Sequence, residues 1–167
     1  IYRCNKPVIA RVNGDAYAGG MGLIAACDIV VAVDSARFCL SEARLGLIPA
    51  TIAPYVIRAL GEQASRRYFT TAEQFDCATA WRLGLVSEAV SAEQLDATVQ
   101  QIAATLCANG PQAVRACKQL VQDIAGQELN EAMIEDTATR IARIRASAEG
   151  REGVASFLEK RSPAWRD

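Results

Sequence analysis

The chain has 167 residues, of which 51% are hydrophobic and 22% are charged, and its formal net charge is −1. This length and apolar content are sufficient for a sizeable hydrophobic core and exclude a disordered tail. The near-neutral charge and the lack of a run of Lys and Arg interleaved with aromatic residues argue against nucleic acid as a partner. No apolar run approaches the length of a bilayer span, so we expect no membrane contact.

The residue types present restrict the chemistry that this chain can perform. It contains no histidine, which excludes Ser-His-Asp and Cys-His nucleophilic sites and most zinc sites that this chain could build alone, and we predict no metal site. Proton transfer must therefore use a carboxylate, Lys, Tyr or Cys. The six cysteines form no CxxC pair and are interpreted as buried small hydrophobic residues rather than disulfides. With no signal peptide and no initial Met, residues 1–6 suggest a cytoplasmic protein that lacks its natural beginning.

The first half of the chain alternates short apolar strands with a glycine-rich turn. Strands are predicted over 7–12, 28–34 and 36–40, in a parallel α/β arrangement. Between the first two lies GDAYAGGMGLIAACD, in which a helix begins near Gly20. Unpaired N–H groups at that helix start could stabilise a developing oxyanion by roughly 3 to 4 kcal/mol each. The alternative is a glycine turn that serves only close packing.

The second half of the chain is predicted to be helical, apart from a short strand or connector over 85–90. The apolar spacing and the capping residues indicate helices over 53–60, 62–69, 76–84 (capped by Asp76), 129–147 and 151–160. A further helix begins at a capping box made by Ser91 and Gln94, and Asn109-Gly110-Pro111 ends it and begins another, whose apolar stripe reaches Ile124. We therefore divide the chain into an α/β part, 1–90, and a helical oligomerisation region, 91–167.

Three blocks resemble the crotonase superfamily of enoyl-CoA hydratases and isomerases. They are KPVIARVNGDAYAGGMGLIAACDIVVA, ARFCLSEARLGLIP and REGVASFLEKRSPAW, in the family's order along nearly the whole chain. The resemblance implies the C-terminal portion of an α/β superhelix of β-β-α turns (the crotonase or ClpP-like fold), followed by a helical trimerisation region. It also implies that an N-terminal part with half of the oxyanion hole is absent, and that the protein forms a homotrimer or a hexamer made of two trimers.

The resemblance carries functional roles over to individual residues. Gly19 matches the glycine whose N–H donates to the thioester oxygen, with Gly20 beside it, and Glu42 matches the second of two family carboxylates. The alternative for Glu42 is a surface ion pair with Arg44. Substrate-binding positions are also implied at Ala50 and, toward a neighbouring subunit's coenzyme A, at Phe157 and Lys160, for which a core anchor and a solvated surface charge are the alternatives.

The first family carboxylate is replaced by Gly22, and this bears on the reaction. A hydratase commonly uses both carboxylates, whereas an isomerase of this family commonly uses only the one at Glu42 as a proton shuttle. Against the isomerase, residues 44–55 resemble hydratases of the methylglutaconyl-CoA and carboxygeranoyl-CoA type, in which glycine also replaces the first carboxylate. Gly22 is expected to leave space for a branched or carboxylated acyl chain.

The resemblance thus predicts an enoyl-CoA hydratase acting on an acyl-CoA substrate, with coenzyme A as part of that substrate and no separate cofactor. Two alternatives stay open, namely an enoyl-CoA isomerase and a crotonase-fold protein that binds acyl-CoA without catalysis. The carboxylate at Glu42 after an intact Gly19-Gly20 turn favours an enzyme over a binder.

Overall fold

The computed structural model describes residues 1–166 and divides into two compact units, Ile1–Gln101 and a second unit that begins at Ile102. The division falls inside helix α5 (Leu95–Cys107) and not before it, where the sequence had suggested a boundary. Leu95 is only 1% exposed and belongs to the hydrophobic core, and this burial ties the start of α5 to the first unit.

The first sheet consists of three parallel strands, β1 (Ile9–Val12), β3 (Ile29–Val33) and β6 (Glu88–Val90), in the order β1-β3-β6. Val31 and Ala32 of the central strand are completely buried. A strand buried on both faces has a continuous apolar sequence, and this explains the run IVVAV. The predicted strands over 7–12 and 28–34 are confirmed, and the short strand expected within 85–90 is β6.

The second sheet contains two strands that the sequence analysis did not predict. Its order is β2 (Ala16–Tyr17), β4 (Arg37–Cys39), β5 (Gln74–Asp76), with β2 parallel and β5 antiparallel to β4. Strands of two and three residues are too short to show a periodic pattern, so only their pairing with β4 reveals them. Phe38 of β4 pairs with Phe75 of β5, and their ring centroids lie 5.7 Å apart.

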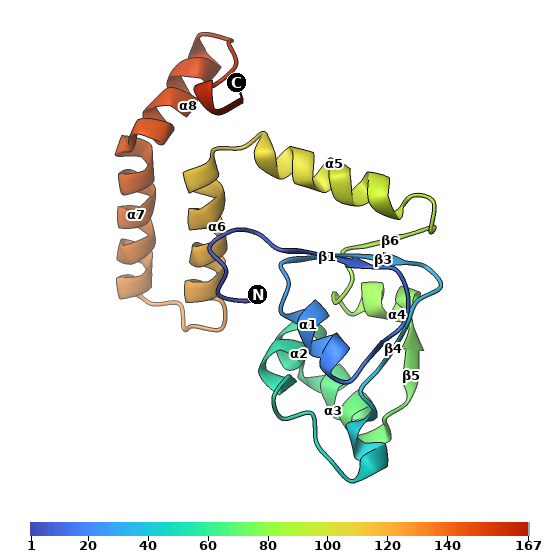
Figure 1. Ribbon diagram of the computed structural model, residues 1–167. Helices are drawn as coiled ribbons and strands as arrows, with labels where there is room; N and C mark the ends of the chain where they lie inside the picture. Colours follow the sequence, from blue (N-terminus) through green and yellow to red (C-terminus); the bar gives the residue numbers. More distant parts are fainter. Residues whose placement is uncertain (167) are drawn as a thin grey trace. The chain divides into compact units, whose positions relative to one another are not determined.

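Four helices of the first unit agree with the sequence prediction and are visible in Figure 1. Asp76 caps the last of them as predicted, because its side chain accepts a hydrogen bond from the Thr79 N–H at 2.8 Å. Gly61, with φ of 78°, separates the second helix from the third. These helices are α1 (Gly19–Ala25), α2 (Ala53–Leu60), α3 (Glu62–Thr71) and α4 (Cys77–Arg82).

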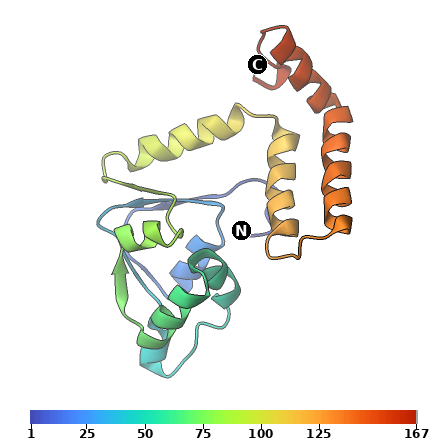
Figure 2. The same cartoon turned by 180° about the vertical axis from the view of Figure 1, so that it is seen from behind.

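The second unit is helical, with α6 (Pro111–Ile124), α7 (Glu131–Ala146), α8 (Ala148–Leu158) and the short 3-10 turn η2 (Ala164–Arg166). Figures 1 and 2 show α6 and α7 running antiparallel and side by side, and an ion pair between Asp123 and Arg140 links them at 2.5 Å. The Glu149 carboxylate of α8 accepts hydrogen bonds from the N–H groups of residues 112 and 113 at the start of α6. One carboxylate thus satisfies two free donors of that helix end.

None of the six cysteines, which all lie within residues 1–166, forms a disulfide, in agreement with the prediction. Cys39 and Cys77 are buried, as expected for small hydrophobic residues. The expectation of burial is wrong for Cys4, Cys107 and Cys117, which are exposed. Apolar neighbours in the sequence do not specify which face of a helix a residue occupies, and this explains the error.

Candidate active site

Two neighbouring parallel strands bring the predicted catalytic residues to the same edge of the second sheet. Gly19 begins α1 directly after β2, and Glu42 lies in the 3-10 turn η1 (Ser41–Leu45) directly after β4. The Ala18 N–H donates to the Cys39 carbonyl at 3.0 Å and so ties the two strand ends together. Carboxyl ends of parallel strands are where α/β proteins place their ligand sites.

The backbone at the start of α1 provides two free hydrogen-bond donors. Within residues 1–166, the N–H groups of Gly19 and Gly20 donate to no other group, and Gly19 is exposed. Ala18 precedes them with φ of 45° and ψ of −116°, a backbone conformation that costs a non-glycine residue about 1 to 3 kcal/mol. The pairing of Ala18 with Cys39 holds this strained turn in place. The donors are therefore preorganised before any ligand binds.

Glu42 is half-buried, and its Oε2 atom is buried without a hydrogen-bond partner among residues 1–166. Its backbone is fixed, because the Glu42 carbonyl accepts a hydrogen bond from the Leu47 N–H at 3.1 Å. The surface ion pair considered as an alternative does not form, since Arg44 donates to the Ala72 carbonyl at 2.5 Å instead. A buried carboxylate oxygen without a partner is costly, and such a group is expected where it has a chemical role.

Cys39 lies close to Glu42 in the chain but is held as a neutral thiol. Its Sγ donates to the Ala72 carbonyl at 3.3 Å, and burial raises the pKa of the thiol. A raised pKa keeps the proton on the sulfur at neutral pH, so Cys39 is neither a nucleophile nor a base there. Among the side chains that directly follow β2 and β4, Glu42 is left as the group that can exchange a proton.

Gly22 does not provide the space that its small size suggested. A Cβ atom built on Gly22 would lie 2.1 Å from Cγ2 of Ile52, so the Ile52 side chain already occupies this position. The expectation of open space for an acyl chain at Gly22 is therefore wrong. Ile52 is thirty residues away in the chain, and no sequence pattern pairs it with Gly22; only the packing of α2 on α1 reveals the contact.

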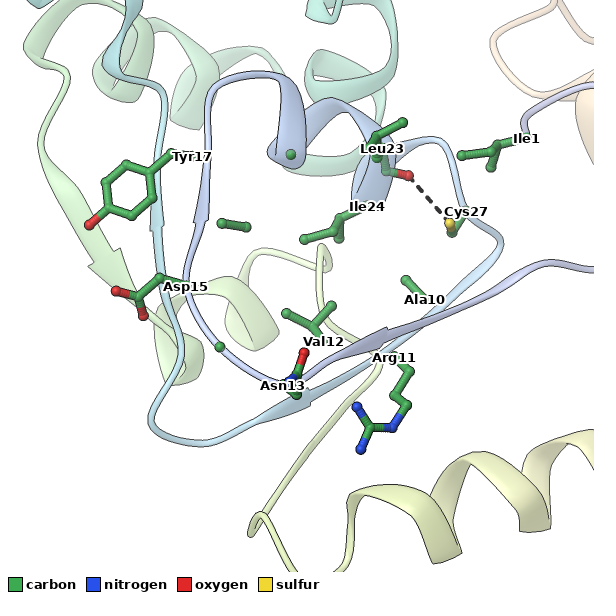
Figure 3. Close-up of a pocket in the computed structure, with 13 residues that line it drawn as sticks. Ile1, Ala10, Arg11, Val12, Asn13, Asp15, Tyr17, Leu23, Ile24 and Cys27 are labelled. Atoms are coloured by element: carbon green, nitrogen blue, oxygen red, sulfur yellow. Dashed lines mark hydrogen bonds between the residues drawn. The ribbon is translucent and has the colours of Figure 1, made fainter.

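A separate pocket of about 410 Å³ lies between β1, β2 and α1 (Figure 3). Gly20, Leu23 and Ile24 of α1 line it together with Cys27, which follows the helix, and neither Gly19 nor Glu42 belongs to its lining. Because each helical residue turns by about 100°, Gly20 lies roughly 200° around α1 from Gly22. Gly20, a further substrate-binding position implied by the family resemblance, thus has a free N–H at the start of α1 and also lines this pocket.

Comparison with known proteins identifies the family and the fold of the chain. Residues 1–167 match the family model described as enoyl-CoA hydratase/isomerase. The chain belongs to this family. An enoyl-CoA hydratase of Shewanella pealeana, solved by crystallography, superposes with a TM-score of 0.92 and 45% identity, covering 96% of this chain and 60% of that one. The high TM-score confirms the crotonase-type α/β fold expected from the sequence.

Relatives of the chain differ in the acyl groups for which they are named. A mevalonyl-coenzyme A hydratase of Aspergillus fumigatus is 35% identical over 98% of this chain, and a 2,3-dehydroadipyl-CoA hydratase of Escherichia coli is 32% identical over 97%. The chain spans 62% and 64% of the lengths of these two relatives.

Within residues 1–166, no helix is both long and apolar enough to cross a bilayer.

The remaining family-derived positions lie on the surface. Ala50 is exposed in the turn before α2, and its N–H donates to the Ile48 carbonyl at 2.9 Å. Phe157 on α8 is 81% exposed, so the alternative of a core anchor is wrong. Lys160, directly after α8, is exposed and has φ of 54°. Phe157 and Lys160 belong to the second unit, and Ala50 belongs to the first.

Much of the closing family block REGVASFLEKRSPAW holds the end of the chain in place. Arg161 pairs with both oxygens of Glu152, at 2.6 and 2.9 Å, and this pairing is the main reason why the pKa of Glu152 falls to about 2. Trp165 packs on Gly153, where an added Cβ would lie 3.1 Å from the indole ring. The Trp165 indole N–H donates to the Ala108 carbonyl at 3.2 Å. This part of the block therefore has a structural role within the second unit.

Proposed function

We propose that the complete protein is an enoyl-CoA hydratase in which Glu42 is the only acid–base carboxylate and Gly19 contributes a donor to the oxyanion hole. The observation that carries this proposal is the buried, unpartnered Oε2 of Glu42, at the sheet edge where the free N–H groups of α1 begin. The hydratase names of the family relatives support the reaction class. The alternative of a non-catalytic binder does not account for a carboxylate kept buried without a partner.

In this mechanism the thioester carbonyl accepts a hydrogen bond from the Gly19 N–H. Glu42 takes a proton from water while the water oxygen forms a bond to C3 of the acyl group, and the electrons of the C2=C3 double bond move onto the thioester oxygen. The resulting enolate is stabilised by preorganised donors. Glu42 then returns the proton to C2, so the carboxylate ends in its starting state and no redox change occurs. Coenzyme A takes part only as the thioester-linked carrier of the acyl group, and the mechanism requires no further cofactor.

We propose a branched or carboxylated acyl chain as the substrate, because Gly22 places no carboxylate on α1 and so avoids a like-charge repulsion there. The expected result is that the complete protein hydrates a 3-methyl-branched, carboxylated enoyl-CoA at least ten times more efficiently than crotonyl-CoA. Tenfold corresponds to about 1.4 kcal/mol in transition-state binding. The measurement is kcat/KM for 3-hydroxyacyl-CoA formation from both substrates, and an equal or reversed preference contradicts the proposal.

The isomerase is retained as a second candidate because one observation favours it. The position of the first family carboxylate is filled by Ile52, so a proton shuttle that uses a single carboxylate is available in this site. The same preparation should be tested for double-bond migration in a 3-enoyl-CoA. Migration without any hydroxyacyl product from either enoyl-CoA would replace the hydratase proposal by the isomerase.

We further propose that the protein forms a homotrimer, or a hexamer of two trimers, through the helical region. Large apolar side chains are exposed on the second unit, and extended exposed apolar surface is rare on soluble monomers. Light scattering at micromolar concentration should therefore give three or six times the protomer mass, and a monomer alone would contradict this prediction. The exposed residues are Val121, Leu129, Ile134, Ile141, Val154, Phe157 and Leu158.

A further inference from the structure

The side chain of Ile52 packs into α1 one helical turn after the free donor of Gly19. Gly19 and Gly22 are three residues apart, so they lie within roughly 60° of one another around the helix and about 4.5 Å apart along it. A Cβ on Gly22 would lie 2.1 Å from Cγ2 and 2.6 Å from Cβ of Ile52. The contact is so close that only glycine fits opposite Ile52. Ile52 therefore borders the face of α1 on which Gly19 begins.

The backbone of Ile52 has little freedom to withdraw. Its N–H donates to the Pro49 carbonyl at 3.2 Å, and its own carbonyl accepts hydrogen bonds from Tyr55 and Val56, both at 3.0 Å, in the first turn of α2. A β-branched side chain is also restricted at χ1. Cγ2 of Ile52 fills the space that a Cβ atom on Gly22 would occupy, and we call this space the notch. Ile52 is only half-buried, so another part of its side chain stays accessible.

We propose that Ile52 is the specificity-determining residue of the acyl site, and this inference rests on the proposed function. Its rigid apolar side chain forms the wall next to the oxyanion donors and limits the bulk that the acyl group can carry at C3. It also excludes a second proton-transfer group from α1, because no side chain fits at Gly22 while Ile52 is present. One side chain thus determines both the shape and the polarity of this wall.

The test compares two substrates that differ by one methyl group at C3, 3-methylcrotonyl-CoA and crotonyl-CoA, in the complete protein. Ile52→Ala opens the notch, and the ratio of their kcat/KM values should rise about fourfold in favour of the branched substrate, the effect of burying one additional methyl group. Ile52→Val is the matched control, since it keeps Cγ2 in the notch, and its ratio should stay within about twofold of wild type. An unchanged or lower ratio in Ile52→Ala overturns the proposal.

Ile52→Leu keeps the assignment testable if the alanine variant is poorly folded. Leucine keeps the side-chain volume but lacks the branch at Cβ that fills the notch, so its bulk moves toward the acyl site. Its kcat/KM ratio should fall, opposite in sign to the effect of Ile52→Ala, and a rise overturns the proposal. Failure of the proposed function has a different signature, because wild type would then form no hydroxyacyl-CoA from any enoyl-CoA.

Discussion

Glu42→Gln in the complete protein is expected to lower the rate of water addition at least 10³-fold, toward the upper end of the range of about 10² to 10⁴ typical of general acid–base catalysis. The loss should be large because the chain has no histidine, Gly22 carries no carboxylate and Cys39 is a neutral thiol. The measurement is kcat under saturating substrate, together with acyl-CoA affinity and the melting temperature.

The structure predicts that this substitution leaves the fold intact. Oε2 of Glu42 makes no hydrogen bond in the part of the chain that the structure describes, so an amide of the same shape removes no partner there. Acyl-CoA affinity should also persist, because the Gly19 donor is unchanged. Glu62→Gln is a suitable control, since that carboxylate is exposed in a surface pair with Arg66 at 3.4 Å. If Glu42→Gln keeps more than about a tenth of the wild-type rate, the single-carboxylate mechanism is wrong.

Gly22→Ala should destabilise the protein by about 1 to 3 kcal/mol, although alanine is ordinarily the better helix former by up to about 1 kcal/mol. The added methyl group would lie 2.1 Å from Cγ2 of Ile52 and cannot be accommodated without moving α2 or the Ile52 side chain. Chemical denaturation provides the measurement, as the change in the free energy of unfolding.

A second substitution separates this clash from other effects of the mutation. Ile52→Ala in the same chain removes Cγ2, and Gly22→Ala should cost less in that background than in wild type, which a double-mutant cycle quantifies. Gly14→Ala is the control, because a Cβ there has no neighbour within 4 Å. Equal costs of Gly22→Ala with and without Ile52 would show that the two residues are not coupled and would remove the basis of the specificity proposal.

Local sequence patterns were sufficient to predict the longer elements and to propose the two central site residues. Apolar runs such as IVVAV and the stop at Gly61 correctly placed β3, α2 and α3. Gly19 and Glu42 followed from motif residues that are contiguous in the chain, and each comes directly after a strand of the second sheet. Patterns of this kind are readable because hydrophobic periodicity and turn residues act over a few neighbouring positions.

By itself, the sequence determined the α/β-then-helical order, the absence of histidine and the carboxylate and glycine motifs of the family. Only the tertiary structure decided that Ile52 fills the notch at Gly22, that Arg44 turns to the Ala72 carbonyl and leaves Glu42 unpaired, and that β2 exists at all. These features join residues that are between 20 and 30 positions apart in the chain. Contacts at such separations depend on how whole elements pack against one another. The pattern of neighbouring side chains in the sequence does not predict that packing.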